Sequence, residues 1–254
     1  MKPSYDPRIR LFVEDDLAAG LSLRLGRDQS HYLANVMRRG TGDRIALFNG
    51  RDGEWTARLD AVARKSCDLI IEDQRRVQPA TVDLWLLFAP IKKARIDFVA
   101  EKATELGVSE IRPVITQRTA MTRVNTARLA ANAREAAEQC ERMEIPIVVE
   151  PMKLETLLDQ WPPERQLMWC DEHGSGPPIA EGLAGLSPAM RRAPWALLIG
   201  PEGGFDDAER ARLATFEPAF AVSLGPRVLR ADTAAAAALS IWQALVGDWQ
   251  VTSL

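Results

Sequence analysis

Cysteine, histidine and long apolar runs are all scarce in this chain of 254 residues. Its three cysteines, Cys67, Cys140 and Cys170, lie far apart and form no CxxC pair, so the sequence predicts neither a disulfide framework nor a zinc knuckle. Cys170 and His173 are close in sequence, but the chain has only two histidines, too few for a typical metal site. We therefore expect no metal cofactor.

No segment approaches the ~18 uncharged apolar residues that a membrane-spanning helix requires. The first residues, MKPSYDPRIRLFVEDD, contain no apolar run followed by a small-residue cleavage site, so they do not resemble a signal peptide. We expect a cytoplasmic protein without a membrane partner.

The chain also lacks the strong positive charge that is typical of nucleic-acid binders, because its net charge is -3. The charges are unevenly distributed, however. Residues 1–80 hold 14 Lys and Arg against 12 Asp and Glu, whereas residues 81–254 hold 18 against 23. The N-terminal part is therefore the better candidate for binding phosphates, although an ordinary solvated surface explains the same charges.

Two kinds of structural pattern follow one another along the chain. The first 78 residues favour a small β barrel with one helical segment at 28–37, since short apolar runs alternate with glycine turns. From residue 82, buried strands alternate with amphipathic helices, which is typical of an α/β domain with a parallel sheet. The expected strands lie at 9–13, 21–25, 43–48, 54–62, 67–73, 82–89, 111–115, 147–149, 166–170, 196–199 and 219–223, and the main helices at 92–106, around 129–140 and 232–246. We expect domains at 1–78 and 79–254.

Two glycine-containing turns follow expected strands. GPEGGF occupies residues 200–205, and Asp206 with Glu209 resembles a capping box that starts the next helix. LGPRVLRADTA occupies 224–234, where Asp232 or Thr233 is expected to cap the last helix. Each turn alone is explained by a strand-to-helix connection without a ligand. Together they predict a ligand site, because ligands of open α/β sheets bind outside the carboxyl ends of the strands.

These two segments resemble the core of SPOUT methyltransferases, and more narrowly the RsmE family, which methylates N3 of uridine-1498 in 16S rRNA. Further segments fit that family in the same order: Ile9–Val13, His31 with Val36-Met37-Arg38, Gly42-Asp43, Lys102–Val108, and Glu138–Arg142 with Pro146. One position departs from the pattern, since Ala231-Asp232 stands where the family usually has Thr-Glu.

The resemblance implies an α/β fold, namely a trefoil-knotted parallel-sheet (SPOUT) methyltransferase domain preceded by a small PUA-like β-barrel domain that binds RNA. It also implies S-adenosylmethionine as the cofactor, 16S rRNA within the small ribosomal subunit as the substrate, and a homodimer. The cofactor pocket that it implies consists of Leu198, Gly200, Glu202, Gly203, Leu224, Gly225, Leu229 and Arg230.

Uracil N3 must lose its proton before it attacks a methyl group, so the reaction requires a base or a cation that stabilises the uracil anion. Arg230 is the candidate cation and Glu202 the candidate base, although ion pairs that hold the fold explain both equally well. The candidate contacts to rRNA phosphates are Arg10, Arg38, Arg39, Lys92, Lys93 and Arg95. For the last three, solvent exposure without a function is an equal alternative.

Three other functions stay open at this point. The first is a knotted methyltransferase with another target, such as a ribose 2'-hydroxyl or a tRNA base. The second is a non-catalytic RNA-binding or ribosome-assembly protein. The third is a nucleotide-dependent oxidoreductase that uses the Gly174-Ser175-Gly176 turn, which lacks the third glycine of the usual motif.

Overall fold

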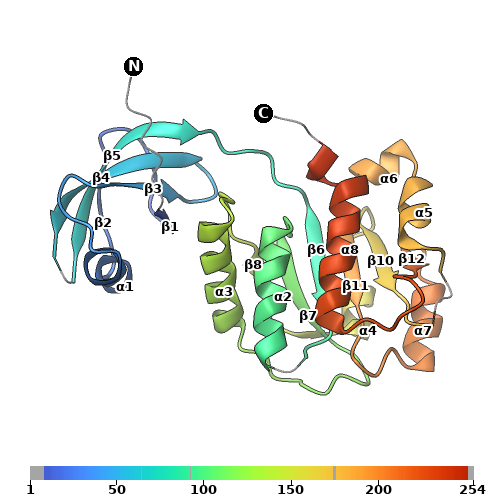
Figure 1. The fold of residues 1–254 in the computed structure, drawn as a ribbon. Coiled ribbons are helices and arrows are strands. Elements are labelled where there is room, and N and C mark those ends of the chain that lie inside the picture. Colours follow the sequence, from blue (N-terminus) through green and yellow to red (C-terminus); the bar gives the residue numbers. More distant parts are fainter. Residues whose placement is uncertain (1–8, 64, 92, 174–175, 251–254) are drawn as a thin grey trace. The chain divides into compact units, whose positions relative to one another are not determined.

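The structure is a computed structural model that describes residues 9–63, 65–91, 93–173 and 176–250 (Figure 1). The chain forms two compact units. The first comprises the chain up to residue 80 together with residues 137–145, and the second comprises residues 81–136 and 146 onward.

The first unit is built on a five-stranded sheet in the order β1-β3-β4-β5-β2. Only β1 and β3 pair in parallel, and the other neighbours are antiparallel. Leu59, Leu69 and Ile71 alternate with more exposed residues, so one sheet face forms the core. The elements are β1 (Arg10–Phe12), β2 (Ser22–Arg24), α1 (Arg27–His31), the π-helix η1 (Tyr32–Val36), β3 (Arg44–Phe48), β4 (Glu54–Val62) and β5 (Cys67–Arg76).

Residues 137–145 pack onto this first unit through a small apolar cluster and a buried charge network. Phe48, Ala137 and Met143 form the cluster. Arg10 is 9% exposed and donates hydrogen bonds to Glu54 Oε2 at 2.7 Å and to the carbonyl oxygen of Ala137 at 2.8 Å. A segment distant in sequence therefore completes the core of the N-terminal unit.

The second unit contains a seven-stranded sheet in which every pair is parallel. Its order is β12-β10-β11-β6-β7-β8, and β9 also pairs with β7. The strands are β6 (Leu84–Phe88), β7 (Glu110–Ile115), β8 (Ile147–Val148), β9 (Met152–Lys153), β10 (Gln166–Cys170), β11 (Trp195–Ile199) and β12 (Ala219–Val222).

Both faces of this sheet are covered, because successive side chains of β6 enter different cores. Leu84 and Leu86 belong to the core formed with α2 and α8, whereas Trp85 and Leu87 belong to the core formed with α4 and α7. The helices are α2 (Lys93–Glu105), α3 (Thr126–Gln139), α4 (Leu154–Asp159), α5 (Ile179–Ala184), α6 (Pro188–Arg192), α7 (Asp207–Ala214), α8 (Ala231–Leu245) and the 3-10 helix η2 (Asp248–Gln250).

The predicted fold class is confirmed, with a small β unit that precedes a parallel α/β unit. The trefoil knot stays a prediction. The short elements β9, α4, α5 and α6 were not predicted, and the expected helix at 28–37 is split into α1 and the π-helix η1. Within the described residues, no helix combines the length and apolarity needed to cross a membrane.

Candidate functional site

Three neighbouring strands of the second unit end beside one another. Strand β10 lies between β11 and β12, although β11 and β12 both follow it in the chain. Asp171 follows β10, Gly200 follows β11, and Leu224 lies just beyond β12. The chain thus changes direction across the sheet at β10, and such a switch point opens a crevice at the carboxyl ends of parallel strands.

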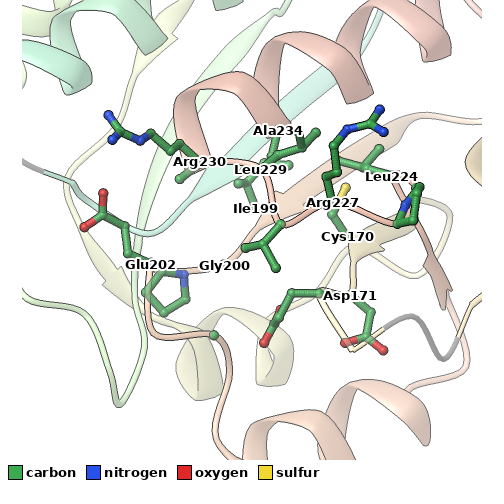
Figure 2. A pocket seen from close by; sticks show the side chains of 17 residues that line it. Cys170, Asp171, Ile199, Gly200, Glu202, Leu224, Arg227, Leu229, Arg230 and Ala234 are labelled. Atoms are coloured by element: carbon green, nitrogen blue, oxygen red, sulfur yellow. The ribbon is translucent and has the colours of Figure 1, made fainter.

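A cavity of about 280 Å³ occupies this crevice (Figure 2). Its apolar wall is formed by Cys170, Ile199, Leu224, Leu229 and Ala234. Burial raises the pKa of the Cys170 thiol to about 12, so this cysteine presents a neutral group to the cavity. The wall is suited to a flat apolar group such as a heterocyclic ring.

Charged side chains of both signs surround the mouth of the cavity. Asp171, Glu172 and Glu202 supply carboxylates, and Arg227 and Arg230 supply guanidinium groups. In Figure 2 Glu202 and Arg230 lie on one side of the cavity, while Arg227 and Asp171 lie at other points of its mouth. The site can therefore bind a ligand that carries both cationic and anionic groups around an apolar body.

The glycine turn after β11 is held by contacts on two sides. Arg118 Nη1 donates a hydrogen bond of 2.9 Å to the carbonyl oxygen of Gly203. On the other side, the predicted capping box is confirmed, since Asp206 accepts from the amide of Glu209 at 2.7 Å and Glu209 accepts from the amide of Asp206 at 3.0 Å. These contacts fix the backbone between β11 and α7 where it borders the cavity.

Helix α8 begins at the cavity, with Ala231 and Ala234 in its lining. The predicted cap is wrong, because the N-cap is Arg230, which makes no side-chain capping bond. Asp232 instead lies in the first turn, and its Oδ1 accepts from the amide of Thr233 at 2.8 Å. The other amide groups at this helix start add positive potential to the site.

Arg95 of α2 reaches the same site and connects its two glycine-containing segments. Its Nη1 donates to Glu202 Oε1 at 2.7 Å, and its Nε lies 3.8 Å from Asp232 Oδ2. Arg95 was expected to contact an rRNA phosphate and Glu202 to act as a base. The structure brings these two residues together in an ion pair.

Most of the predicted cofactor residues line the cavity, namely Gly200, Glu202, Leu224, Gly225, Leu229 and Arg230. Leu198 and Gly203 do not. Leu198 is fully buried in the core on the α4 and α7 side, and a Cβ on Gly203 would face Arg118 at 3.6 Å. Cys170, Asp171 and Glu172 also line the cavity but were not predicted to bind the cofactor, although their place at the end of a predicted buried strand is a usable signal.

The arginines predicted to contact RNA differ in how exposed they are. Arg38 is exposed and has an unusual positive φ of 51°, whereas Arg39 is half-buried. The hypothesis for Arg10 is wrong, because its guanidinium is buried and bonded to Glu54 and to backbone carbonyls. Lys92 and the side chain of Lys93 lie outside the described residues, as do Gly174 and Ser175.

A cluster of possible metal ligands borders the cavity, but an arginine occupies it. Ligand atoms of Asp171, Glu172 and His173 lie within 4.8 Å of one another. Arg210 forms an ion pair with the buried Asp171, and its Nη1 lies 2.6 Å from His173 Nδ1. A cation that already contacts two of the three ligands disfavours a metal ion at this position.

Comparison with known proteins assigns family models to both parts of the chain. Residues 78–243 match the RNA methyltransferase domain, and residues 25–72 match the RNA methyltransferase PUA domain. A ribosomal RNA small subunit methyltransferase E from Rickettsia conorii is 29% identical over 232 residues, which cover 91% of this chain and 93% of that protein.

Two solved structures are similar along almost their whole length. A ribosomal RNA small subunit methyltransferase E from Neisseria gonorrhoeae, bound to S-adenosylmethionine, has a TM-score of 0.84 and 27% identity, and the match covers 95% of this chain and 99% of that one. A methyltransferase from Legionella pneumophila in complex with the same cofactor has a TM-score of 0.79 and 30% identity, with coverages of 93% and 97%.

Proposed function

The chain belongs to the RNA methyltransferase family, and we propose that it methylates N3 of uridine-1498 in the 16S rRNA of the small ribosomal subunit. It is an rRNA methyltransferase that depends on S-adenosylmethionine, as the relatives named for small-subunit rRNA and the cofactor-bound structures support. The choice of N3 and of uridine-1498 rests on the motif resemblance to the RsmE family. We further propose that the enzyme acts in the cytoplasm as a homodimer.

The observation that carries this proposal is the cavity at the ends of β10, β11 and β12. Its residues fit the cofactor, because an apolar wall is suited to adenine, and the mouth offers carboxylates to the ammonium group of the amino acid part and the start of α8 to its carboxylate. Gly225 lines the cavity with a φ of +104°, and no atom lies within 4 Å of where its Cβ would be. Backbone and ligand can approach closely there.

Arg230 is the proposed catalytic residue of this site. When bound, S-adenosylmethionine supplies a methyl group on a positively charged sulfur. The enzyme then has to align the uracil and favour loss of its N3 proton. The Arg230 guanidinium is exposed at the cavity mouth, where it is placed to stabilise the uracil anion. Glu202 lines the same mouth, and because its Oε1 is engaged by Arg95, Oε2 is the atom that is left to act as a base.

The first unit is proposed to dock the rRNA through Arg38 and Arg39. The two arginines follow a π-helix, a rare conformation that is frequent at functional sites, and Arg38 adopts the left-handed backbone conformation. The Nε atom of Arg39 is buried and has no hydrogen-bond partner among the described residues. An RNA phosphate can provide the missing acceptor once the Arg39 side chain turns outward.

The test is methyl transfer from labelled S-adenosylmethionine to purified small subunits that lack the modification. We expect one methyl group per subunit, recovered as N3-methyluridine after digestion and located at uridine-1498 by primer extension. Label in a ribose hydroxyl or in another base would contradict the proposed position. Tight cofactor binding without any transfer would contradict enzymatic methylation of this RNA.

A further inference from the structure

The segment Arg227–Arg230 carries exposed side chains that the proposed reaction has not yet used. Arg227 is exposed, and no hydrogen bond or ion pair of its side chain occurs within the described part of the chain. Val228 is 87% exposed, which is the highest exposed fraction among the large apolar side chains of the described residues. By contrast, Arg95, Arg118 and Arg210 near the same site all bind protein groups.

Arg227 lies at the outer edge of the cavity mouth. It belongs to the Gly225–Arg230 segment of the lining, across the cavity from Glu202. In Figure 2 the guanidinium groups of Arg227 and Arg230 point in different directions, away from the apolar wall between them. Arg227 is thus directed to the outside of the mouth rather than to its floor.

The geometry of the reaction decides which ligand group reaches this place. An acceptor base has to approach the methyl carbon to about 3 to 3.5 Å, so the nucleotide enters the cavity base first. Its phosphates then stay at the rim, because a cavity of about 280 Å³ is shared with the cofactor. The carboxylates of Glu202 and Asp171 already form ion pairs with Arg95 and Arg210. The guanidinium of Arg227, unpaired within the described residues, is therefore the place at the rim where a phosphate can be bound.

We propose that Arg227 binds an rRNA phosphate next to the acceptor nucleotide and that Val228 packs against the extruded nucleotide. This inference rests on the proposed function. The arginine fork suits a phosphate, and the exposed valine offers an apolar surface to an unstacked base or ribose. The catalytic unit then contacts the RNA itself, in addition to the docking residues of the first unit.

The variants R227A, R227K and V228S test this proposal, with R192A as the matched control. Arg192 is an exposed arginine at the end of α6 and does not line the cavity. Apparent KM for small subunits is measured at several salt concentrations, and cofactor affinity is measured by calorimetry. For R227A we expect KM to rise about tenfold and the salt slope to fall by about 1, while cofactor affinity changes less than twofold.

R227K is expected to recover most of the salt slope but less of the affinity, since it keeps the charge and loses the fork. V228S is expected to raise KM without changing the slope. An unchanged KM and slope for R227A, with active wild type, contradicts the inference alone. Equal losses of cofactor and subunit affinity also contradict it, because Arg227 would then hold the cofactor. A wild-type protein that transfers no methyl group contradicts the proposed function itself.

Discussion

Arg95 Nη1 donates a hydrogen bond of 2.7 Å to Glu202 Oε1 and thereby connects α2 to the glycine turn after β11. The two side chains are 31% and 52% exposed. An ion pair of this exposure contributes about 1 kcal/mol or less to folding, so its role lies in positioning the turn rather than in stabilising the domain. The pair also offsets the charge of Arg95, which makes Arg95 a weaker candidate for a phosphate contact than an unpaired arginine.

We predict that Arg95→Ala weakens cofactor binding a few-fold and leaves the salt dependence of subunit binding unchanged. Cofactor binding should weaken because Glu202 loses its hydrogen-bond partner. The salt dependence should not change because the Arg95 guanidinium is already paired with Glu202. Calorimetry with the cofactor and subunit binding at several salt concentrations measure both. A salt slope that falls by about 1, with unchanged cofactor affinity, would make Arg95 an RNA contact instead.

Arg230→Lys is predicted to slow the chemical step. Lysine keeps the positive charge but lacks the planar fork, and loss of one such electrostatic contact commonly costs on the order of 10² to 10³ in kcat. We expect a fall of this size in the single-turnover rate, a much smaller change in cofactor affinity, and partial rescue at higher pH, where the uracil ionises unaided.

The matched control for that prediction is Arg192→Lys, which changes an exposed arginine away from the cavity. Its single-turnover rate is expected to equal that of the wild type. An Arg230→Lys enzyme that is equally fast at neutral pH, or that fails only because it no longer binds the cofactor, would remove Arg230 from the chemistry.

Much of the fold is predictable because its patterns are local. The apolar run at β6 and the helical spacing of Ile96, Val99 and Ala103 each report on burial within a few residues of sequence. The capping box of Asp206 and Glu209 is similarly local, and its residues specify where α7 begins. Such features do not depend on distant parts of the chain.

The parts that the sequence did not reveal depend on long-range contacts or on uniform composition. From the sequence alone, Arg10 is expected to be an exposed cation. Its burial depends on contacts with the distant Glu54 and the 137–145 segment. In β11 every residue is apolar and buried, so no alternation indicates which face a side chain takes. The sequence alone thus does not show that Ile199 lines the cavity while Leu198, its neighbour, belongs to the core on the opposite face of the sheet.

The two adjacent glycines of the turn are predicted to respond differently to alanine. At Gly204 the φ is +69°, a conformation that strains alanine, and the new Cβ would force the Glu172 carboxylate, which lines the cavity, to move. At Gly203 the nearest atom would lie at an ordinary contact distance of 3.6 Å. We expect Gly204→Ala to weaken cofactor binding at least tenfold and Gly203→Ala to change it less than twofold, both measured by calorimetry. Equal effects would contradict this description of the turn.

The buried Glu54 is predicted to make folding of the first unit sensitive to acid. Burial by itself raises the pKa of Glu54, but hydrogen bonds from Arg76 and Arg10 outweigh that effect and hold its pKa below the ordinary value. The folded state therefore binds fewer protons than the unfolded state. The contribution to stability is complete well above the ordinary glutamate pKa of about 4.3 and is lost as the pH falls below it.

Glu54→Gln is the variant that tests this contribution. It leaves the buried Arg10 without a counter-charge, so we expect a loss of about 3 kcal/mol in the free energy of unfolding at pH 7. The difference from wild type should shrink as the pH approaches 3, because wild-type Glu54 is then being protonated as well. Chemical unfolding across this pH range, followed by a probe in the first unit, measures both effects.

Asp68→Asn serves as the control for Glu54→Gln. Its carboxylate also has a pKa below the ordinary value, through its hydrogen bond with Arg24, but that pair is exposed to solvent. Water replaces the lost partner there, so we expect a much smaller change in stability at every pH. Equal destabilisation by the two variants would show that burial does not distinguish the two ion pairs. A Glu54→Gln protein with wild-type stability at pH 7 would show that the Arg10 network does not hold residues 137–145 on the first unit.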